Sequence, residues 1–91
     1  MTSETIHLLP IYFEVDGVVA EILEILEHKF DERIIGYTVS MRIMYKGIKS
    51  RVFPLDCKDL KDLINKLKVE ISKLKFMEIV LGLPELRRLI T

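Results

Sequence analysis

The chain has 91 residues, of which 49% are hydrophobic, and its 14 basic and 14 acidic side chains cancel to a formal net charge of zero. This length suits one domain, so we expect residues 1–91 to form a single unit. The one cysteine excludes an internal disulfide, and no apolar run approaches the roughly 18 residues of a membrane-spanning helix. We therefore expect a cytoplasmic protein without a membrane partner. The lack of Gln and the single Asn are typical of thermophilic, archaeal-like proteins.

Charge is divided unevenly along the chain. Residues 1–32 carry eight acids and one base, whereas residues 33–91 carry thirteen bases and six acids. The two ends can attract each other, or two copies can pair head to tail. Two solvated faces of opposite sign are an equally good interpretation. A hydrophobic chain without net charge also tends to associate with other chains.

A first strand is predicted at residues 9–15, which are rich in β-forming residues. Pro10 cannot donate a ladder hydrogen bond, so this strand should begin near the edge of a sheet. Asp16 and Gly17 follow it, and we interpret them as a break that caps a helix.

That helix is predicted at residues 18–30, because its apolar residues recur at spacings of three and four. They cover an arc wider than a surface helix needs to bury itself on one sheet. Part of this surface should therefore contact another chain. The predicted contact residues are Val18, Ile22 and Ile25.

Strict alternation predicts a strand at residues 35–45, and a turn at Lys46-Gly47 leads into another strand at residues 48–55. This hairpin carries bases and no acid, with Phe53 expected on its outer face. Such a face suits nucleic acid, since phosphates bind basic side chains while a base stacks on the ring. A basic hairpin can equally serve only to discourage edge aggregation. The candidate nucleic-acid residues are Arg42, Lys46, Lys49 and Arg51.

Asp56 is expected to cap a second helix that runs to Leu81 and ends at Gly82. Its inward residues, spaced by three and four, begin at Leu60. The alternative, in which residues 76–81 form a fourth strand, stays open. Apolar residues on the opposite side of the helix should contact a partner. They are Val69, Phe76 and Val80.

A short final helix at residues 85–90 completes a β-α-β-β-α order, which is an α+β fold. A right-handed crossover from the first strand to the second leaves room for the third between them. We therefore expect a three-stranded antiparallel sheet ordered 1-3-2, with two helices on one face and a short C-terminal helix.

Residues that could carry chemistry are scattered. The four glycines form neither a P-loop nor a dinucleotide fingerprint. His7 and His28 lie on different elements without metal-ligand spacing, and Cys57 has no histidine partner. We expect no enzyme activity, no cofactor and no metal site.

The segment LDCKDLKDLINKLKVEISKLKFMEIVL, residues 55–81, resembles the long C-terminal helix of the small dimerising subunit of KEOPS, the CTAG-like family. The hairpin before it and the predicted element order also match that family. At three mid-helix positions the family's Asn-Ser pair and Arg are replaced, which suits a divergent paralogue. The matching positions are Asp59, Leu60, Leu63, Leu67, Ile71 and Leu74, and the replaced ones are Lys68, Val69 and Ser72.

The resemblance implies a non-catalytic subunit of a complex that places threonylcarbamoyl on an adenosine beside the anticodon of certain tRNAs. Its partners would be other KEOPS-like subunits, or a homologous small subunit in a homodimer or heterodimer, and it would contact tRNA indirectly or weakly. The residues alone leave an alternative, an independent small nucleic-acid-binding or architectural dimer that uses the basic hairpin face.

Overall fold

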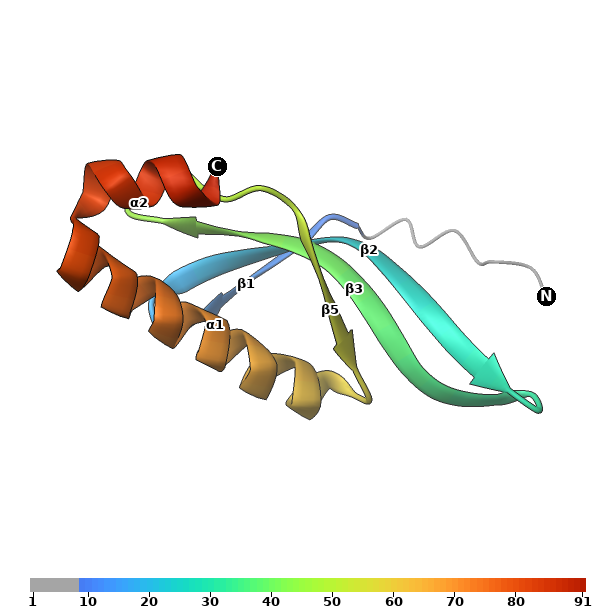
Figure 1. Cartoon of the computed structure of the whole chain (residues 1–91). Coiled ribbons are helices and arrows are strands. Elements are labelled where there is room, and N and C mark those ends of the chain that lie inside the picture. Colours follow the sequence, from blue (N-terminus) through green and yellow to red (C-terminus); the bar gives the residue numbers. More distant parts are fainter. Residues whose placement is uncertain (1–8) are drawn as a thin grey trace.

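The structure, a computed structural model, describes residues 9–91, and His7 lies outside them. Its antiparallel strands form a curved sheet, and the longer helix lies across the concave face (Figure 1). The elements are β1 (Ile11–Val15), β2 (Val18–Phe30), β3 (Arg33–Tyr45), β4 (Ile48–Lys49), β5 (Phe53–Cys57), α1 (Leu60–Leu81) and α2 (Leu83–Ile90).

Three two-residue turns join the first four strands to one another. All six turn residues have positive φ, between 49° and 81°, as in the type I′ turns whose twist matches that of the flanking strands. Each turn therefore folds the chain straight back, so that consecutive strands become neighbours. The turns are Asp16-Gly17, Asp31-Glu32 and Lys46-Gly47.

Replacement of Gly17 by alanine should destabilise the protein. Gly17 has a φ of 81°, and a Cβ there meets no atom within 4 Å, so the cost comes from the backbone conformation alone. We expect a loss of about 1 kcal/mol, because a Cβ disfavours this region by roughly that amount. Glu32→Ala is the matched control, since Glu32 already carries a side chain at φ 64°. Urea unfolding that showed equal midpoints for both variants would contradict this account.

The predicted helix at residues 18–30 is wrong: the segment is strand β2, hydrogen-bonded to both β1 and β3. Its partners shift between Ile22 and Glu24, which leaves Leu23 as the extra residue of a β-bulge. Val18 and Ile22 face the core before the bulge, and Ile25 faces it afterwards. In a regular strand the inward residues are an even number of positions apart. The extra residue places Ile22 and Ile25 three positions apart, so Val18, Ile22 and Ile25 have the spacings of four and three that are typical of a helix.

The predicted sheet, three strands in the order 1-3-2 beneath two helices, is also wrong. The strands run β1-β2-β3-β4, and β5 pairs with β3 beyond the end of β4. The physical reason is the Asp16-Gly17 turn, which makes a hairpin where a crossover was expected. β1 does lie at the edge of the sheet, as Pro10 indicated.

The alternation predicted for β3 is confirmed from Val39 to Tyr45, whereas Ile35 is 61% exposed. The strand predicted at residues 48–55 is broken into β4 and β5. At the break, the Arg51 N–H donates to the carbonyl of Ile90 over 2.8 Å, so this stretch leaves the sheet to meet α2. The inward and outward residues change accordingly: Val52 is exposed and Phe53 packs against the core.

The long second helix is confirmed as α1, which includes residues 76–81 and so excludes a fourth strand there. Its N-cap is Asp59 instead of Asp56, and Asp59 Oδ1 accepts a hydrogen bond from the Asp62 N–H at 2.8 Å. Leu60, expected to face inward, is 66% exposed. The buried face of α1 consists of Leu63, Leu67, Ile71 and Leu74.

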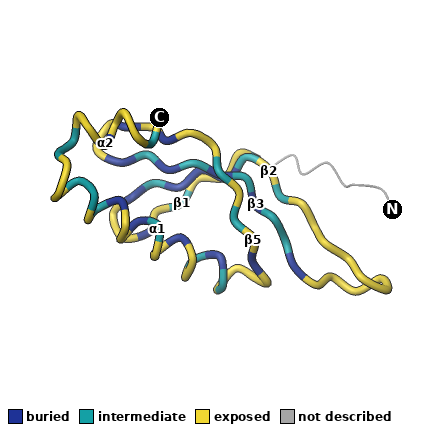
Figure 2. The backbone as a smooth tube through the Cα atoms, viewed as in Figure 1, coloured by how far each residue is buried: buried dark blue, intermediate teal, exposed yellow. Residues whose placement is uncertain are grey.

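The hairpin of β2 and β3 projects beyond the rest of the sheet. β1 pairs only with Val18–Ile22, and β5 pairs only with Tyr37–Met41. Beyond these pairs, from His28 to Gly36, the projection has only two strands. Residues 26–35, here called the arm, are all exposed (Figure 2).

Candidate functional site

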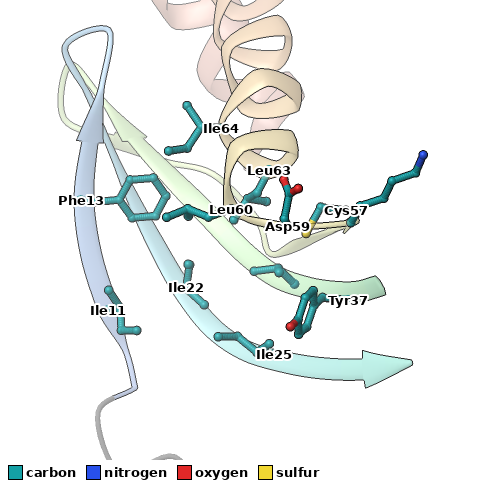
Figure 3. Close-up of a pocket in the computed structure, with 12 residues that line it drawn as sticks. Ile11, Phe13, Ile22, Ile25, Tyr37, Cys57, Asp59, Leu60, Leu63 and Ile64 are labelled. Atoms are coloured by element: carbon teal, nitrogen blue, oxygen red, sulfur yellow. The ribbon is translucent and has the colours of Figure 1, made fainter. Parts of the chain in front are cut away.

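An apolar groove lies between the concave face of the sheet and the first turns of α1 (Figure 3). Its volume of about 630 Å³ falls within the range of roughly 300–1,000 Å³ that is usual for binding clefts. Side chains from β1 and β2 face side chains from α1 across it. They include Ile11, Phe13, Ile22, Ile25, Leu60 and Ile64.

The groove exists because α1 follows β5 after only two residues. The first turns of the helix therefore stay near β5 and β3, while β1 lies on the far side of β2. The space between the start of β1 and the first turns of α1 is left uncovered, whereas Lys75, later in α1, donates to the Asp16 carbonyl at the other end of β1. Two residues of the rim are open to solvent, since Leu60 is 66% exposed and Ile11 is 37% exposed. The result is an accessible apolar channel.

The three contact residues predicted between positions 18 and 30 lie in two different environments. Val18 is completely buried in the core, and Ile22 is 7% exposed at the floor of the groove. Ile25 is half-buried and lines the same groove. The predicted helix surface on this segment is therefore the inner face of a sheet. No simple signal of composition or periodicity indicated the groove, which needs both β1 and α1.

The predicted contact residues on the second helix do lie on its outer side. Val69, Phe76 and Val80 are 54%, 66% and 63% exposed. Sequence reasoning missed Ile79, which is 82% exposed beside them, although its apolar character in an otherwise amphipathic helix was a usable signal. We call Val69, Phe76, Ile79 and Val80 the outer stripe of α1.

Two of the four candidate nucleic-acid residues lie on the outer face of the sheet. Arg42 Nε donates to Glu21 Oε1 at 2.5 Å, so its charge is paired. Lys49 lies opposite Met44 in the β3–β4 ladder, and Met44, two residues after Arg42 on β3, points to the same side of the sheet as Arg42. Lys49 therefore also points outward.

The other two candidate bases lie toward the helices. Lys46 Nζ donates to Glu78 Oε2 on α1 at 2.8 Å. Arg51 Nη2 donates to the carbonyl oxygen of Leu89 on α2 at 3.1 Å. The four residues therefore do not share one surface.

The carboxylates of Glu21 and Glu78 form ion pairs with Arg42 and Lys46, and both are largely shielded from solvent. Glu21 is 6% exposed in its side chain, and hydrogen bonds from Arg42 and Tyr12 hold its pKa below the usual range. Hydrogen bonds from Lys46 and Tyr45 do the same for the pKa of Glu78. The second carboxylate links the β3–β4 turn to α1.

Acid should destabilise the protein through Glu21 and Glu78. Because both pKa values are depressed in the folded state, their contribution is fully present above the unfolded-state pKa of about 4.3. It is lost as the pH falls through the lower folded-state values. The double variant Glu21→Gln, Glu78→Gln should be less stable than wild type at pH 7 and should lose less stability between pH 7 and pH 3.

Urea midpoints at both pH values measure this dependence. Glu24→Gln is the control, since Glu24 is exposed and has no ion pair among the residues that the structure describes. A double variant with the same pH dependence as wild type would show that these two carboxylates are not responsible.

The reactive side chains of Cys57 and His28 are held within the structure, the first by burial and the second by a hydrogen bond. Cys57 is buried at the end of β5, and burial, with a smaller contribution from Asp62, raises the pKa of its thiol. His28 Nε2 lies 2.6 Å from Thr38 Oγ1, which donates to Asp56 Oδ1 at 2.5 Å. Since the Thr38 hydrogen goes to Asp56, His28 must donate, and the chain of bonds joins β2, β3 and β5.

Comparison with protein-family models, curated proteins and solved structures found no match to this chain. Within residues 9–91, no group of three or more His, Cys, Asp or Glu side chains could hold a metal ion. Nor does that part of the chain contain a helix long and apolar enough to cross a membrane.

Proposed function

We propose that the protein is a non-catalytic binding subunit that takes an extended, apolar segment of a partner protein into the groove beneath α1. The observation that carries this proposal is the groove itself, an apolar channel with an exposed hydrophobic rim. Apolar patches that remain open to water are characteristic of surfaces that contact another chain.

The position of β1 favours an extended occupant. β1 is the last strand of the sheet, so one of its edges has no neighbour among residues 9–91. A segment added to this edge would gain main-chain hydrogen bonds. Alternate residues of that segment would point to the same side as Ile11 and Phe13, which line the groove. Strand addition thus supplies both affinity and side-chain selectivity.

Membership in a KEOPS-like complex is the finer form of this proposal. It is supported by the helix pattern, whose positions Leu63, Leu67, Ile71 and Leu74 form the buried face of α1. The β-α-β-β-α order that also favoured it is not the order of this chain. Assembly assistance and indirect tRNA contact within such a complex therefore stay predictions. An independent nucleic-acid-binding role gains no specific support, because its four bases do not share a face.

The experiment compares the partners captured by wild type and by Leu60→Glu from native extract. Leu60 is exposed at the groove rim in the first turn of α1, where an acidic residue is favourable, so the fold should persist. We expect Leu60→Glu to lose partners that wild type retains. Lys61→Glu is the matched control, because Lys61 is the exposed neighbour and is not among the residues that line the groove.

Mass spectrometry of the captured proteins then separates the two forms of the proposal. KEOPS subunits among the groove-dependent partners would support the finer form. Other groove-dependent proteins would support only the binding role. Identical partner sets for wild type and Leu60→Glu would refute the groove as the binding site.

A further inference from the structure

The arm, residues 26–35, exposes apolar side chains that nothing in the described chain covers. Leu26, Phe30, Ile34 and Ile35 are 55%, 68%, 47% and 61% exposed. A two-stranded ribbon is only marginally stable by itself in water, and an exposed apolar ribbon invites association. The arm therefore needs a covering surface.

The outer stripe of α1 has the dimensions of such a surface. Val69 and Val80 are eleven residues apart, which corresponds to roughly 16 Å along a helix at about 1.5 Å per residue. The β2 strand of the arm, residues 26–30, spans about 13–16 Å, and the return strand begins after the turn, at Arg33. The two apolar surfaces match in length.

The two surfaces also differ in the sign of their charge. The arm, residues 26–35, carries three acids against two bases, whereas α1 carries five lysines against three acids. All three helix acids are already paired, Glu78 with Lys46 of the β3–β4 turn, and Asp62 and Glu70 with lysines of α1 itself. Complementary charge favours contact between the arm and the helix and disfavours contact between two arms.

Their placement favours a second copy of the same chain. The arm tip lies at one end of the molecule, and the junction of α1 with α2 lies at the opposite end (Figure 1). The arm of a chain therefore cannot reach its own outer stripe. Two copies side by side in opposite directions would bring each arm to the other's stripe, and both contacts would be related by one two-fold axis.

We infer that two copies of this chain form a reciprocal dimer in which the arm of each packs on the outer stripe of α1 of the other. Phe30 pairs with Arg33 and Ile34 pairs with Lys29, so the exposed apolar side chains of the arm lie on both of its faces. The stripe and one face of the arm expose on the order of 700 Å² of apolar residues, close to the roughly 800 Å² per partner of a stable interface. This inference rests on the proposed function in that the protein works through apolar contacts between chains. It uses different residues from the groove, so the two can fail separately.

Sedimentation equilibrium of the full chain tests the dimer. Wild type should be a dimer, and Phe30→Glu or Phe76→Glu should each weaken dimerisation by about 30-fold or more, the effect of a hot-spot side chain. Both residues are exposed, so far-UV circular dichroism should not change. Val52→Glu is the control, because Val52 is 49% exposed outside both surfaces and should leave the dimer intact.

A mixture of the two variants gives the decisive result. In a Phe30→Glu homodimer both contacts are damaged, and the same holds for Phe76→Glu. A heterodimer of the two has one contact with both substitutions and one contact that is fully wild type. We therefore expect the mixture to form heterodimers more tightly than either variant forms homodimers.

Three outcomes overturn the inference: a monomeric wild type, variants that dimerise like wild type, or a mixture no tighter than its components. If Phe76→Glu alters the fold, Ile79→Lys replaces it, since Ile79 is the most exposed residue of the stripe. Leu60→Glu should remain dimeric. Loss of groove-dependent partners in a chain that stays dimeric, or the converse, shows which of the two proposals has failed.

Discussion

Replacement of Ile22 by aspartate is expected to unfold the protein. Ile22 is 7% exposed, pairs with Met41 across the β2–β3 ladder and belongs to the core. A carboxylate there would be buried without a partner, at a cost of several kcal/mol. Since a small domain has a total stability near the lower end of about 5–15 kcal/mol, this loss should leave little folded protein. Far-UV circular dichroism and urea titration measure it.

Leu26→Asp provides the comparison on the same strand. Leu26 is 55% exposed in the arm, so an aspartate there remains solvated and the fold should persist. The comparison of these two variants distinguishes a strand at residues 18–30 from the helix that the apolar spacing of this segment predicts. In a helix with an apolar contact surface, Ile22→Asp would spare the isolated fold and disturb only a contact with a partner. A folded Ile22→Asp would therefore contradict the sheet described here.

Truncation of Leu67 to alanine should have the next largest effect. Leu67 is completely buried in the middle of α1 against the sheet. Leu→Ala in a well-packed core costs about 2–5 kcal/mol, from the lost burial and the cavity that remains. At roughly 4–8 °C per kcal/mol for a domain of this size, the melting temperature should fall by about 10–25 °C.

Val69→Ala, two residues further along the same helix, is the matched control. Val69 is 54% exposed on the outer stripe, so its truncation should change the stability of a single chain little. In the reciprocal dimer it should instead weaken association. Equal melting temperatures for Leu67→Ala and Val69→Ala would show that α1 does not bury the face described here.

Local patterns were sufficient for several elements. The alternation in β3 and the Lys46-Gly47 turn depend on neighbouring residues alone, and so does the termination of α1 at Gly82. The outer stripe was also largely predictable, because helical periodicity places Val69, Phe76 and Val80 opposite the buried leucines. In each case the physical cause acts within a few residues.

The segment from Val18 to Phe30 shows where such patterns are ambiguous. Its bulge at Leu23 produces a helical spacing within a strand. The Asp16-Gly17 pair favours a helix cap and a type I′ hairpin turn alike. Pairing with β1 and β3 decides between them, because each neighbour satisfies one edge of the β2 backbone, and β3 lies later in the sequence.

The ion pairing of the basic residues and the shape of the groove both depend on residues that lie far apart in the sequence. Arg42 is paired with a carboxylate 21 residues away, and Lys46 with one 32 residues away, so a basic hairpin in sequence is partly neutralised in space. The groove exists only because α1 starts beside β5 and its first turns leave the start of β1 uncovered.

By itself, the sequence determined the long amphipathic helix, the alternating strand and the apolar surplus, since these follow from the order of side chains along a local backbone. Tertiary structure alone decided the sheet order, the strand identity of β2, the pairing of the basic residues and the groove. These depend on hydrogen bonds and contacts between segments far apart in the chain, whose free energy exceeds any local preference.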